Sequence, residues 1–232
     1  MRKSFLQSIF PRRCVSCHST WAYLCAWCKK SLIPHPELCP VCHVKSSDFV
    51  ICRQCRDRVN YRSIMVLFHY TGVLKKLILK LKYYHVSDVA EFLAERLRYG
   101  LLTNATFQSD IQHRPVIITR VASHRYRHYF VKWYNQSEIL ATAVGQILWY
   151  TTLQLVKKHK HTASQAQLKR GERLKNLTGS FHSCASLQGN EVIVIVDDIA
   201  TTGSSIQAIA QTLHATYPDV VVRWLVVGRN NS

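Results

Sequence analysis

Short apolar runs and stretches of helical periodicity alternate along the second half of the chain. Four runs rich in β-branched residues predict strands, and they lie at residues 115–119, 152–156, 192–196 and 220–227. Helical patterns occupy residues 136–150 and 202–216. Because the runs are apolar at nearly every position and alternate with helices, they indicate an α/β fold with a parallel sheet.

A further strand and two helices are expected before this alternation. Residues 63–70 are predicted to form a strand, and apolar residues recur at helical spacing from Gly72 onward. Ser87 or Asp88 suits the N-cap of a second helix that runs to about Leu102. The polar positions of the first helix form either a solvated face or, with aromatic neighbours, a surface for single-stranded DNA. The lysines at these positions are Lys75, Lys76, Lys80 and Lys82.

The stretch 139–156 is apolar enough to be compared with a membrane span. It carries two glutamines and three threonines and lacks anchoring residues on both sides, so a helix packed on a sheet and followed by a short strand is expected. The first 14 residues contain neither the long apolar core nor the cleavage site of an export signal. We therefore expect a cytoplasmic protein, with a peripheral position at the inner membrane as the alternative.

The net charge narrows the class of partner. The 232 residues include 31 lysines and arginines against 13 acidic residues, which gives a formal net charge of +18. An excess of this size points to a polyanion or an anionic membrane surface. The excess is +7 in residues 1–60, +8 in residues 61–135 and +3 in residues 136–232, so it is concentrated before the last three predicted strands.

Eight of the nine cysteines form four C-x-x-C pairs. In a reducing compartment thiolates favour metal coordination over disulfides, and two such pairs complete a tetrahedral Zn²⁺ shell. The sequence therefore predicts two structural zinc ions in a zinc-ribbon head over residues 1–60, followed by an α/β domain over residues 61–232. The expected ligands are Cys14, Cys17, Cys25, Cys28, Cys39, Cys42, Cys52 and Cys55.

The pairing of these cysteines has two solutions. Sequential pairing, 14/17 with 25/28 and 39/42 with 52/55, is favoured because each ribbon then folds around its own metal. The interleaved alternative joins the first pair with the third and the second with the fourth.

The pattern C-x-x-C-H, which ends at His18 and again at His43, also matches haem attachment. Haem attachment would require export and would leave two cysteine pairs unused. We expect both histidines at the tight turn after a knuckle.

Two carboxylates followed by a hydroxyl-rich loop form the second candidate site. Asp197 and Asp198 end a predicted strand, and ligands of parallel sheets bind outside the carboxyl ends of strands. The loop "ATTGSS" opens a helix, whose backbone N–H groups attract anions. This combination suits a phosphorylated sugar, with the acids on its hydroxyls and the loop on its phosphate. The acids alternatively suit Mg²⁺.

The stretch "VIVIVDDIATTGSSI" resembles the phosphoribosyl-pyrophosphate motif of type I phosphoribosyltransferases. Nearly the whole chain is similar to ComF proteins, through the cysteine head, "YTGVLKKLILKLKY" at 70–83, "YNQSEILA" at 134–141 and "SQAQLKRGERLKNLTGSF" at 164–181. The resemblance implies a phosphoribosyltransferase-like fold behind a double zinc ribbon. It also implies a role in natural transformation, in which single-stranded DNA enters the cytoplasm beside a helicase-like ComF protein and an inner-membrane DNA channel.

The same resemblance implies roles for individual residues. Asp197 and Asp198 would bind the ribose hydroxyls of phosphoribosyl pyrophosphate and act as the catalytic acids, and Mg²⁺ would accompany this ligand. Asn135 and Gln136 would brace the pocket. Arg173 would contact the pyrophosphate from a closing loop that also holds Gln165 and Asn176. The 5′-phosphate would be wrapped by Ala200, Thr201, Thr202, Gly203, Ser204 and Ser205.

The chain departs from the family pattern in the region that should hold the pyrophosphate. The family's "RGFNQ" is "KWYNQ" at 132–136, with Trp133 in place of glycine. The preceding loop reads "ITRVASHRYRH" instead of a proline-rich sequence. Its positive charges are Arg120, His124, Arg125 and Arg127.

Two functions from different classes follow from these features. A DNA-uptake factor would use the zinc ribbons and the basic first half for single-stranded DNA and the pocket for phosphoribosyl pyrophosphate or a DNA end. A metabolic phosphoribosyltransferase would transfer phosphoribose to a nucleobase or related acceptor through an oxocarbenium-like state. No hood that stacks on a base is evident, and a zinc head is superfluous to that chemistry, so the first hypothesis is favoured.

Overall fold

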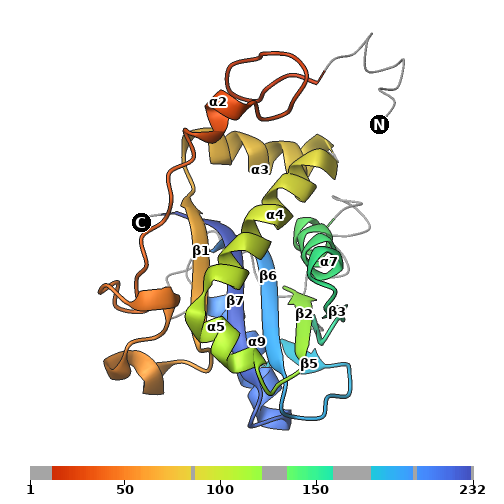
Figure 1. The fold of residues 1–232 in the computed structure, drawn as a ribbon. Helices are drawn as coiled ribbons and strands as arrows, with labels where there is room; N and C mark the ends of the chain where they lie inside the picture. The colour runs from red at the N-terminus through yellow and green to blue at the C-terminus, as the bar shows by residue number, and fades with distance from the viewer. Residues whose placement is uncertain (1–11, 85–86, 122–134, 159–178, 201–202, 231–232) are drawn as a thin grey trace.

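A five-stranded parallel sheet forms the centre of the protein (Figure 1). The computed structural model describes residues 12–84, 87–121, 135–158, 179–200 and 203–230. Within these ranges the strand order is β1-β7-β6-β2-β3. The strands are β1 (Ser63–His69), β2 (Val116–Arg120), β3 (Thr151–Thr152), β6 (Val192–Ala200) and β7 (Val221–Arg229). The predicted α/β fold with a parallel sheet is confirmed.

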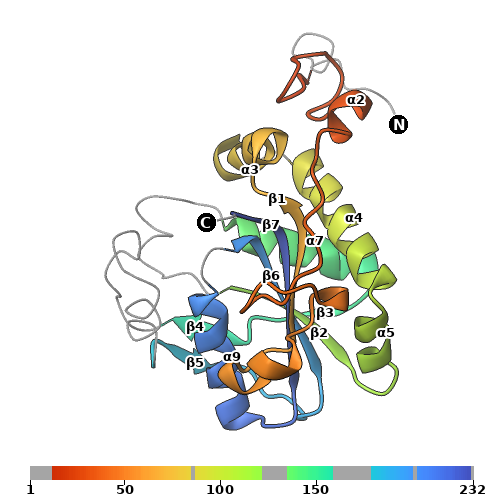
Figure 2. The same cartoon turned by 90° about the vertical axis from the view of Figure 1, so that its left-hand side faces the viewer.

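Helices and a small second sheet cover the two faces (Figures 1 and 2). One face carries α3 (Gly72–Tyr84), α4 (Ser87–Thr103), α5 (Ala105–Ile111) and α7 (Gln136–Leu148). The other carries α9 (Ser204–Thr216) and the antiparallel pair of β4 (Val156–Lys158) and β5 (Phe181–Ser183). Both layers bury apolar side chains against the sheet, as the predicted apolar runs require.

Two local features differ from the sequence-based expectation. The strand predicted at 152–156 is wrong as one element: only Thr151 and Thr152 join the main sheet, whereas Val156–Lys158 pairs with Phe181–Ser183 in the small sheet. Helix α5 was not predicted, and Asn104 caps it by accepting a hydrogen bond from the Phe107 N–H at 2.8 Å. Strands β3 and β4 and helix α5 are all too short to show a clear hydrophobic period in the sequence.

The two cysteine-rich ribbons lie on different sides of the sheet (Figure 2). The first, residues 12–30 with α2 (Ala26–Lys29), packs buried residues such as Cys14 and Leu24 with α3 and α4. The second, residues 37–58 with η1 (Ser47–Phe49) and η2 (Arg53–Arg58), packs with β1, β7 and α9. The division into a head and an α/β domain near residue 60 stays a prediction, since each ribbon contributes to a different core.

Residues 33–35, between the ribbons, lie along β1 at the rim of the sheet. The His35 N–H donates to the Leu67 carbonyl at 3.0 Å, and the His69 N–H donates to the Ile33 carbonyl at 2.9 Å. Pro34 and Phe68 form an antiparallel bridge. This connecting segment therefore pairs with β1 through an isolated antiparallel bridge.

Residues 139–156 do not form a single helix. Helix α7 ends at Leu148 and is followed by β3. Among the residues that the structure describes, no helix has both the length and the apolar character needed to cross a membrane.

Candidate functional site

Asp197 and Asp198 lie near the carboxyl end of β6, the central strand of the sheet. The preceding strand residues, Val192–Val196, are fully buried, so the strand holds the two acids in a fixed position. Asp198 is buried and Asp197 is half-buried. The two carboxylates thus lie near the edge where ligands of parallel sheets bind, and their role in binding stays a prediction.

Asp197 is held by α7. The Ser137 hydroxyl donates to Asp197 Oδ1 at 2.6 Å, and the Asp198 N–H donates to the same oxygen at 2.9 Å. Ser137 lies in the first turn of α7, whose N-cap is Asn135. Asn135 thus acts on the acid through the start of the helix, and Ser137 is a contact that the sequence interpretation missed.

Asp198 is paired with Lys82. The Lys82 Nζ lies 2.7 Å from Asp198 Oδ2, and the lysine belongs to the last turns of α3. Burial lowers the pKa of Lys82, but the charge of Asp198 and a hydrogen bond to it outweigh this, and the net pKa is raised. Lys82 is therefore a permanent cation at this site, separate in its contacts from the exposed Lys75 and Lys76.

The pKa of Asp197 lies far above its ordinary value. Burial, followed by the charge of Asp198, raises the pKa of Asp197 from its ordinary value of 3.8 to about 8, although the Ser137 hydroxyl and the Asp198 N–H act in the opposite direction. Two close carboxylates cannot both ionise cheaply away from water. Asp197 thus holds a proton near neutral pH.

A pH dependence of stability follows from this pKa. Between 3.8 and about 8 the native state holds a proton on Asp197 that the unfolded chain releases, so stability falls as pH rises through this window. Asp197→Asn keeps a neutral side chain at every pH. We expect its stability relative to the native sequence to grow by up to about 1.4 kcal/mol per pH unit between about pH 6 and pH 8. Urea unfolding at several pH values measures this, and a pH-independent difference would contradict the assignment.

The loop that follows β6 begins α9 at a left-handed glycine. Gly203 has φ 74°, a conformation that residues with a Cβ rarely adopt, and it is the N-cap of α9. Ser204 is buried and Ser205 is half-buried at the start of this helix, and Ala200 is buried at the end of β6. The remaining predicted phosphate-loop residues, Thr201 and Thr202, lie outside the described residues.

Of the other predicted residues, Arg120 lies at the neighbouring strand end, opposite Val196, and several lie outside the described residues. Arg120 ends β2, where its Nη1 lies 2.7 Å from Glu138 Oε1 and its Nη2 donates to Gln154 Oε1 at 3.0 Å. Gln136 is the first residue of α7 and is half-buried. The predicted residues outside the described ranges are His124, Arg125, Arg127, Trp133, Gln165, Arg173 and Asn176.

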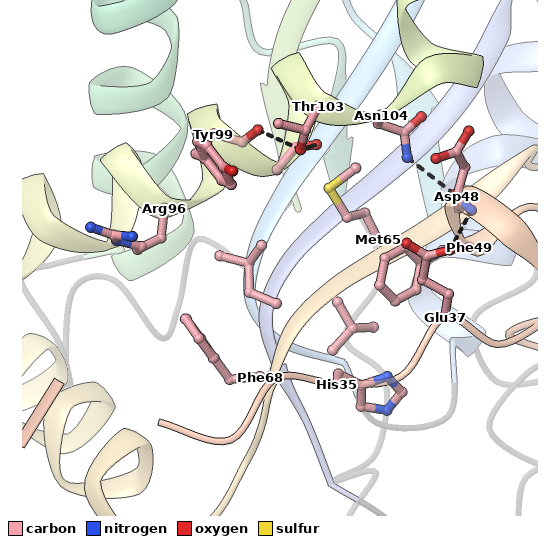
Figure 3. A pocket seen from close by; sticks show the side chains of 13 residues that line it. His35, Glu37, Asp48, Phe49, Met65, Phe68, Arg96, Tyr99, Thr103 and Asn104 are labelled. Atoms are coloured by element: carbon pink, nitrogen blue, oxygen red, sulfur yellow. Dashed lines mark hydrogen bonds between the residues drawn. The ribbon is translucent and has the colours of Figure 1, made fainter. Parts of the chain in front are cut away.

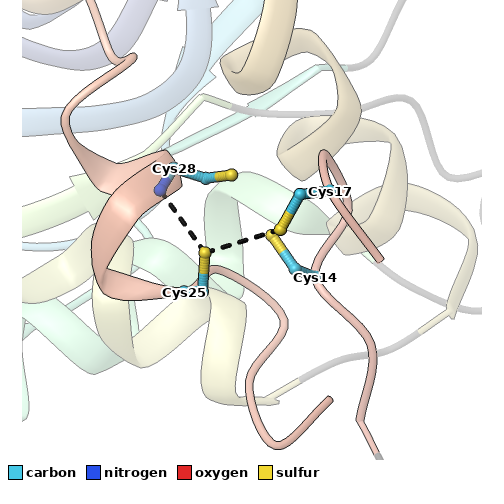
Figure 4. Close-up of side chains that lie close together, drawn as sticks. All are labelled: Cys14, Cys17, Cys25 and Cys28. Atoms are coloured by element: carbon cyan, nitrogen blue, oxygen red, sulfur yellow. Dashed lines mark hydrogen bonds between the residues drawn. The ribbon is translucent and has the colours of Figure 1, made fainter. Parts of the chain in front are cut away.

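The cysteines form two tetrads with sequential pairing. Figure 4 shows the first of them. Cys14, Cys17, Cys25 and Cys28 bring their sulfur atoms within 4.8 Å of one another, and residues 39, 42, 52 and 55 do the same. Four thiolates at the Zn–S distance of about 2.3 Å lie about 3.8 Å apart, so both tetrads fit a zinc ion. The sequential prediction is confirmed, and the interleaved alternative is wrong.

The two knuckles repeat the same backbone geometry. His18 has φ 61° and donates its N–H to the Cys14 carbonyl at 3.0 Å; His43 has φ 63° and donates to the Cys39 carbonyl at 2.9 Å. Each histidine thus occupies the left-handed turn after a knuckle, as predicted. Burial raises the pKa of Cys14, but backbone N–H groups, that of Cys25 foremost, lower it to about 6, whereas burial raises the pKa of Cys28 in the same tetrad to about 12.

A separate pocket lies between β1, α4 and the second ribbon (Figure 3). It encloses 310 Å³, and both acids on its wall are engaged in the fold. Glu37 accepts from the Asp48 N–H at 3.0 Å, and Asp48 Oδ2 accepts from the Thr106 N–H at 2.8 Å. The first contact lies within the second ribbon and the second joins the ribbon to α5, so we assign this pocket no chemistry.

Comparison with known proteins finds relatives over most of the chain, although no family model matches it. The DNA utilization protein YhgH of Salmonella typhimurium is 30% identical over 200 residues, which cover 84% of this chain and 85% of that protein. YhgH of Escherichia coli is 29% identical over 195 residues, covering 82% and 83%. Competence protein F of Haemophilus influenzae is 26% identical over 230 residues, covering 94% and 98%.

Proposed function

This chain belongs to the ComF-like family of competence protein F and the DNA utilization protein YhgH, and we propose from this that it binds incoming single-stranded DNA during natural transformation. The similarity over 84% of the chain to a protein named for DNA utilization carries the proposal. The strong positive charge supports it, because counterion release from a polyanion drives binding of this kind. A helicase-like protein and a membrane channel would be its partners in that process.

The first ribbon offers the groups that single strands require. Trp27 is 77% exposed and Trp21 60%, which is unusual for large aromatic side chains. Lys29 and Lys30 are exposed on the same ribbon, and the Lys30 Nζ lies 5.8 Å from the centre of the Trp27 ring. Bases stack on aromatic rings while lysines meet the phosphates, so this combination suits single-stranded DNA without sequence preference.

Helix α3 extends this surface. The first ribbon sits beside α3 in both views (Figures 1 and 2), and Leu24 of the ribbon and Leu77 of α3 line one small cavity between them. On α3, Lys75 and Lys76 are exposed and Lys80 is half-buried. We propose that these three lysines continue the phosphate track from the ribbon. Lys82 is omitted from it because it is paired with Asp198.

A charge reversal tests the DNA-binding surface. We expect Lys75→Glu with Lys76→Glu and Lys80→Glu to weaken binding of every single-stranded sequence alike, because phosphate contacts carry no base information. The slope of log affinity against log salt should fall by about 0.7 per lost contact. Fluorescence anisotropy with labelled oligonucleotides of different composition measures both quantities.

The matched control reverses the same number of charges elsewhere. Arg53, Arg56 and Arg58 are exposed on the second ribbon, and reversing them changes the net charge equally. Equal losses of DNA affinity in both triple variants would show that the net positive charge of the protein, and not this particular surface, attracts the DNA. In cells, the α3 variant should lower transformation while growth on salvaged purines and pyrimidines stays normal.

We further propose that the carboxyl edge of the sheet binds phosphoribosyl pyrophosphate or a similar phosphosugar. Asp197 and Asp198 would accept hydrogen bonds from the ribose hydroxyls, and the residues from Gly203 to Ser205 would meet the 5′-phosphate. A sugar hydroxyl must then compete with Lys82 for Asp198. Mg²⁺, held by the two carboxylates, would neutralise ligand phosphates in this position.

A metabolic phosphoribosyltransferase is the second candidate function. The observation in its favour is the carboxyl pair beside a left-handed glycine that opens a helix. Loss of nucleobase salvage, without loss of transformation, in an Asp197→Asn and Asp198→Asn strain would place this function first.

A further inference from the structure

A cavity of 150 Å³ lies between the first ribbon, α3 and α4. The buried part of its lining consists of Leu24 from the ribbon, Leu77 from α3 and Val89 from α4. Its volume equals that of about five water molecules, which suits one flat ring and is too small for two stacked rings. The cavity therefore offers an apolar slot for a single small group.

Three aromatic side chains border the same cavity. Tyr23 and Phe92 are half-buried, and Trp21 is 60% exposed. Trp21 and Tyr23 belong to the ribbon and Phe92 belongs to α4, so both elements contribute rings to the lining. A flat heterocycle gains most from such surroundings, because its faces stack on aromatic rings in addition to the contacts that any apolar group would make.

Two cations of the lining are held beside these rings. The Arg12 Cζ lies 5.8 Å from the centre of the Tyr23 ring, and the Lys29 Nζ lies 5.1 Å from the centre of the Phe92 ring. Lys29 is exposed, so its ammonium group can meet a phosphate in solvent while its stem stays near the ring. A slot bordered by rings and cations matches a nucleotide, whose base is flat and whose phosphate is anionic.

An ion pair joins the two elements that border the cavity. Arg12 Nη1 pairs with Asp88 Oδ2, and Asp88 lies in the first turn of α4. The pair ties the start of the described ribbon to the helix, so the cavity exists before any ligand enters it. A preformed site avoids part of the ordering cost of binding. The pair also balances the carboxylate, which would otherwise repel a phosphate.

The backbone of Trp21 is held in a strained conformation beside this cavity. Trp21 has φ 84°, in the left-handed region that a bulky residue rarely occupies. Its N–H donates to the Arg12 carbonyl at 2.7 Å, which fixes the turn. Glycine would adopt this conformation without strain. Strained residues cluster at ligand sites, so a large, exposed ring at this turn supports a ligand in the cavity.

We propose that this cavity receives one unstacked base of a DNA single strand. The base would stack on the rings of Trp21 and Tyr23, and Lys29 would meet the phosphate of the same nucleotide. The inference rests on the proposed binding of single-stranded DNA and adds an anchoring point to it, because the lysines of α3 would follow the backbone while the cavity fixes one nucleotide. Every base has a flat face, so the site would accept all four.

The test compares oligothymidylate with an oligomer of equal length that carries abasic sites in place of all bases. Both oligomers carry the same phosphates, so the difference in their affinity for the full-length, zinc-loaded chain measures contacts to bases. We expect the native chain to favour oligothymidylate by at least about fivefold. Ala22→Met fills the cavity without removing a ring or a charge. It should weaken binding of oligothymidylate by about 5- to 150-fold, the range for stacking of one base, and leave the abasic oligomer unaffected.

A second variant and a matched control make this result specific. Trp21→Leu removes one ring and should cause the same selective loss, so it tests the site independently if Ala22→Met perturbs the ribbon. The control is Trp149→Leu, at the C-cap of α7, where another exposed tryptophan has a left-handed backbone with φ 58°. It should bind both oligomers like the native chain. Equal affinity of the native chain for the two oligomers, or native affinity for oligothymidylate in both cavity variants, would overturn the proposal.

A mononucleotide separates failure of this site from failure of the proposed function. Thymidine 5′-monophosphate, unlike deoxyribose 5-phosphate, should quench the tryptophan fluorescence of the native chain, and Ala22→Met should raise the required concentration at least about fivefold. If this pattern appears but no oligonucleotide binds, the cavity is a nucleotide site and the proposed DNA binding is wrong. If oligonucleotides bind but Ala22→Met changes neither their affinity nor that of the mononucleotide, DNA binding stands and the cavity proposal is wrong.

Discussion

Replacing Cys39 by serine is expected to release one of two zinc ions and to destabilise the sheet as well as the second ribbon. Cys39 is fully buried and packs in the same core as Tyr61, Ile64 and Trp224. A structural zinc site contributes its binding energy to folding, so the loss should be at least about 3 kcal/mol, the upper range for single substitutions. Elemental analysis and urea unfolding measure the two effects.

Two matched variants make this result specific. Cys184→Ser removes the exposed cysteine outside the tetrads and should change neither the zinc content nor the unfolding midpoint. Cys14→Ser should also release one zinc ion, but it should loosen the contacts of the first ribbon with α3 and α4. Two equivalents of zinc in the Cys39→Ser protein would show that the second tetrad is not a zinc site.

Replacing both Asp197 and Asp198 by asparagine is expected to abolish binding of phosphoribosyl pyrophosphate. A charge-assisted hydrogen bond to a ribose hydroxyl is worth about 1.5–3 kcal/mol, and one with the protonated Asp197 about 0.5–1.5 kcal/mol, so the pair accounts for a loss of roughly 30- to 2,000-fold. Isothermal titration calorimetry measures the affinity. Circular dichroism should stay unchanged, because both residues lie near the end of β6 and asparagine preserves their shape.

The control for this variant is Glu95→Gln, which removes a carboxylate on α4 that pairs with Arg98 at 3.0 Å. It should leave the affinity unchanged. A double variant that binds the ligand as tightly as the native chain would exclude the two acids from the ligand site. A Lys82→Met variant tests the ion pair at Asp198, because its loss should alter the affinity for phosphoribosyl pyrophosphate.

The main elements of the fold are predictable from local patterns. The β-branched run ending at Asp197 has one plausible conformation, and the C-x-x-C spacing leaves few ways to complete a tetrahedral shell. The left-handed turn at His18 and His43 follows from the knuckle itself. In each case the residues that decide the structure are close together in the sequence.

Contacts between distant segments could not be predicted in the same way. Lys82 looks like one more lysine of a basic helix, and only the packing of α3 against the sheet brings it to Asp198. Nothing in the sequence relates His35 to His69 and Arg229, which meet because β1 and β7 are neighbours and the connecting segment runs beside them. The packing of the two ribbons in two different hydrophobic cores also depends on contacts between segments that are distant in the sequence.

The pairing of residues 33–35 with β1 has a consequence for chains that lack zinc. An open strand rim is a template on which strands of other molecules can assemble, and this rim is occupied only while Ile33 and His35 stay in place. Their position depends on the ribbons that flank them on both sides. Removal of metal from the tetrads is therefore expected to expose the edge of β1 and to promote self-association of the chain.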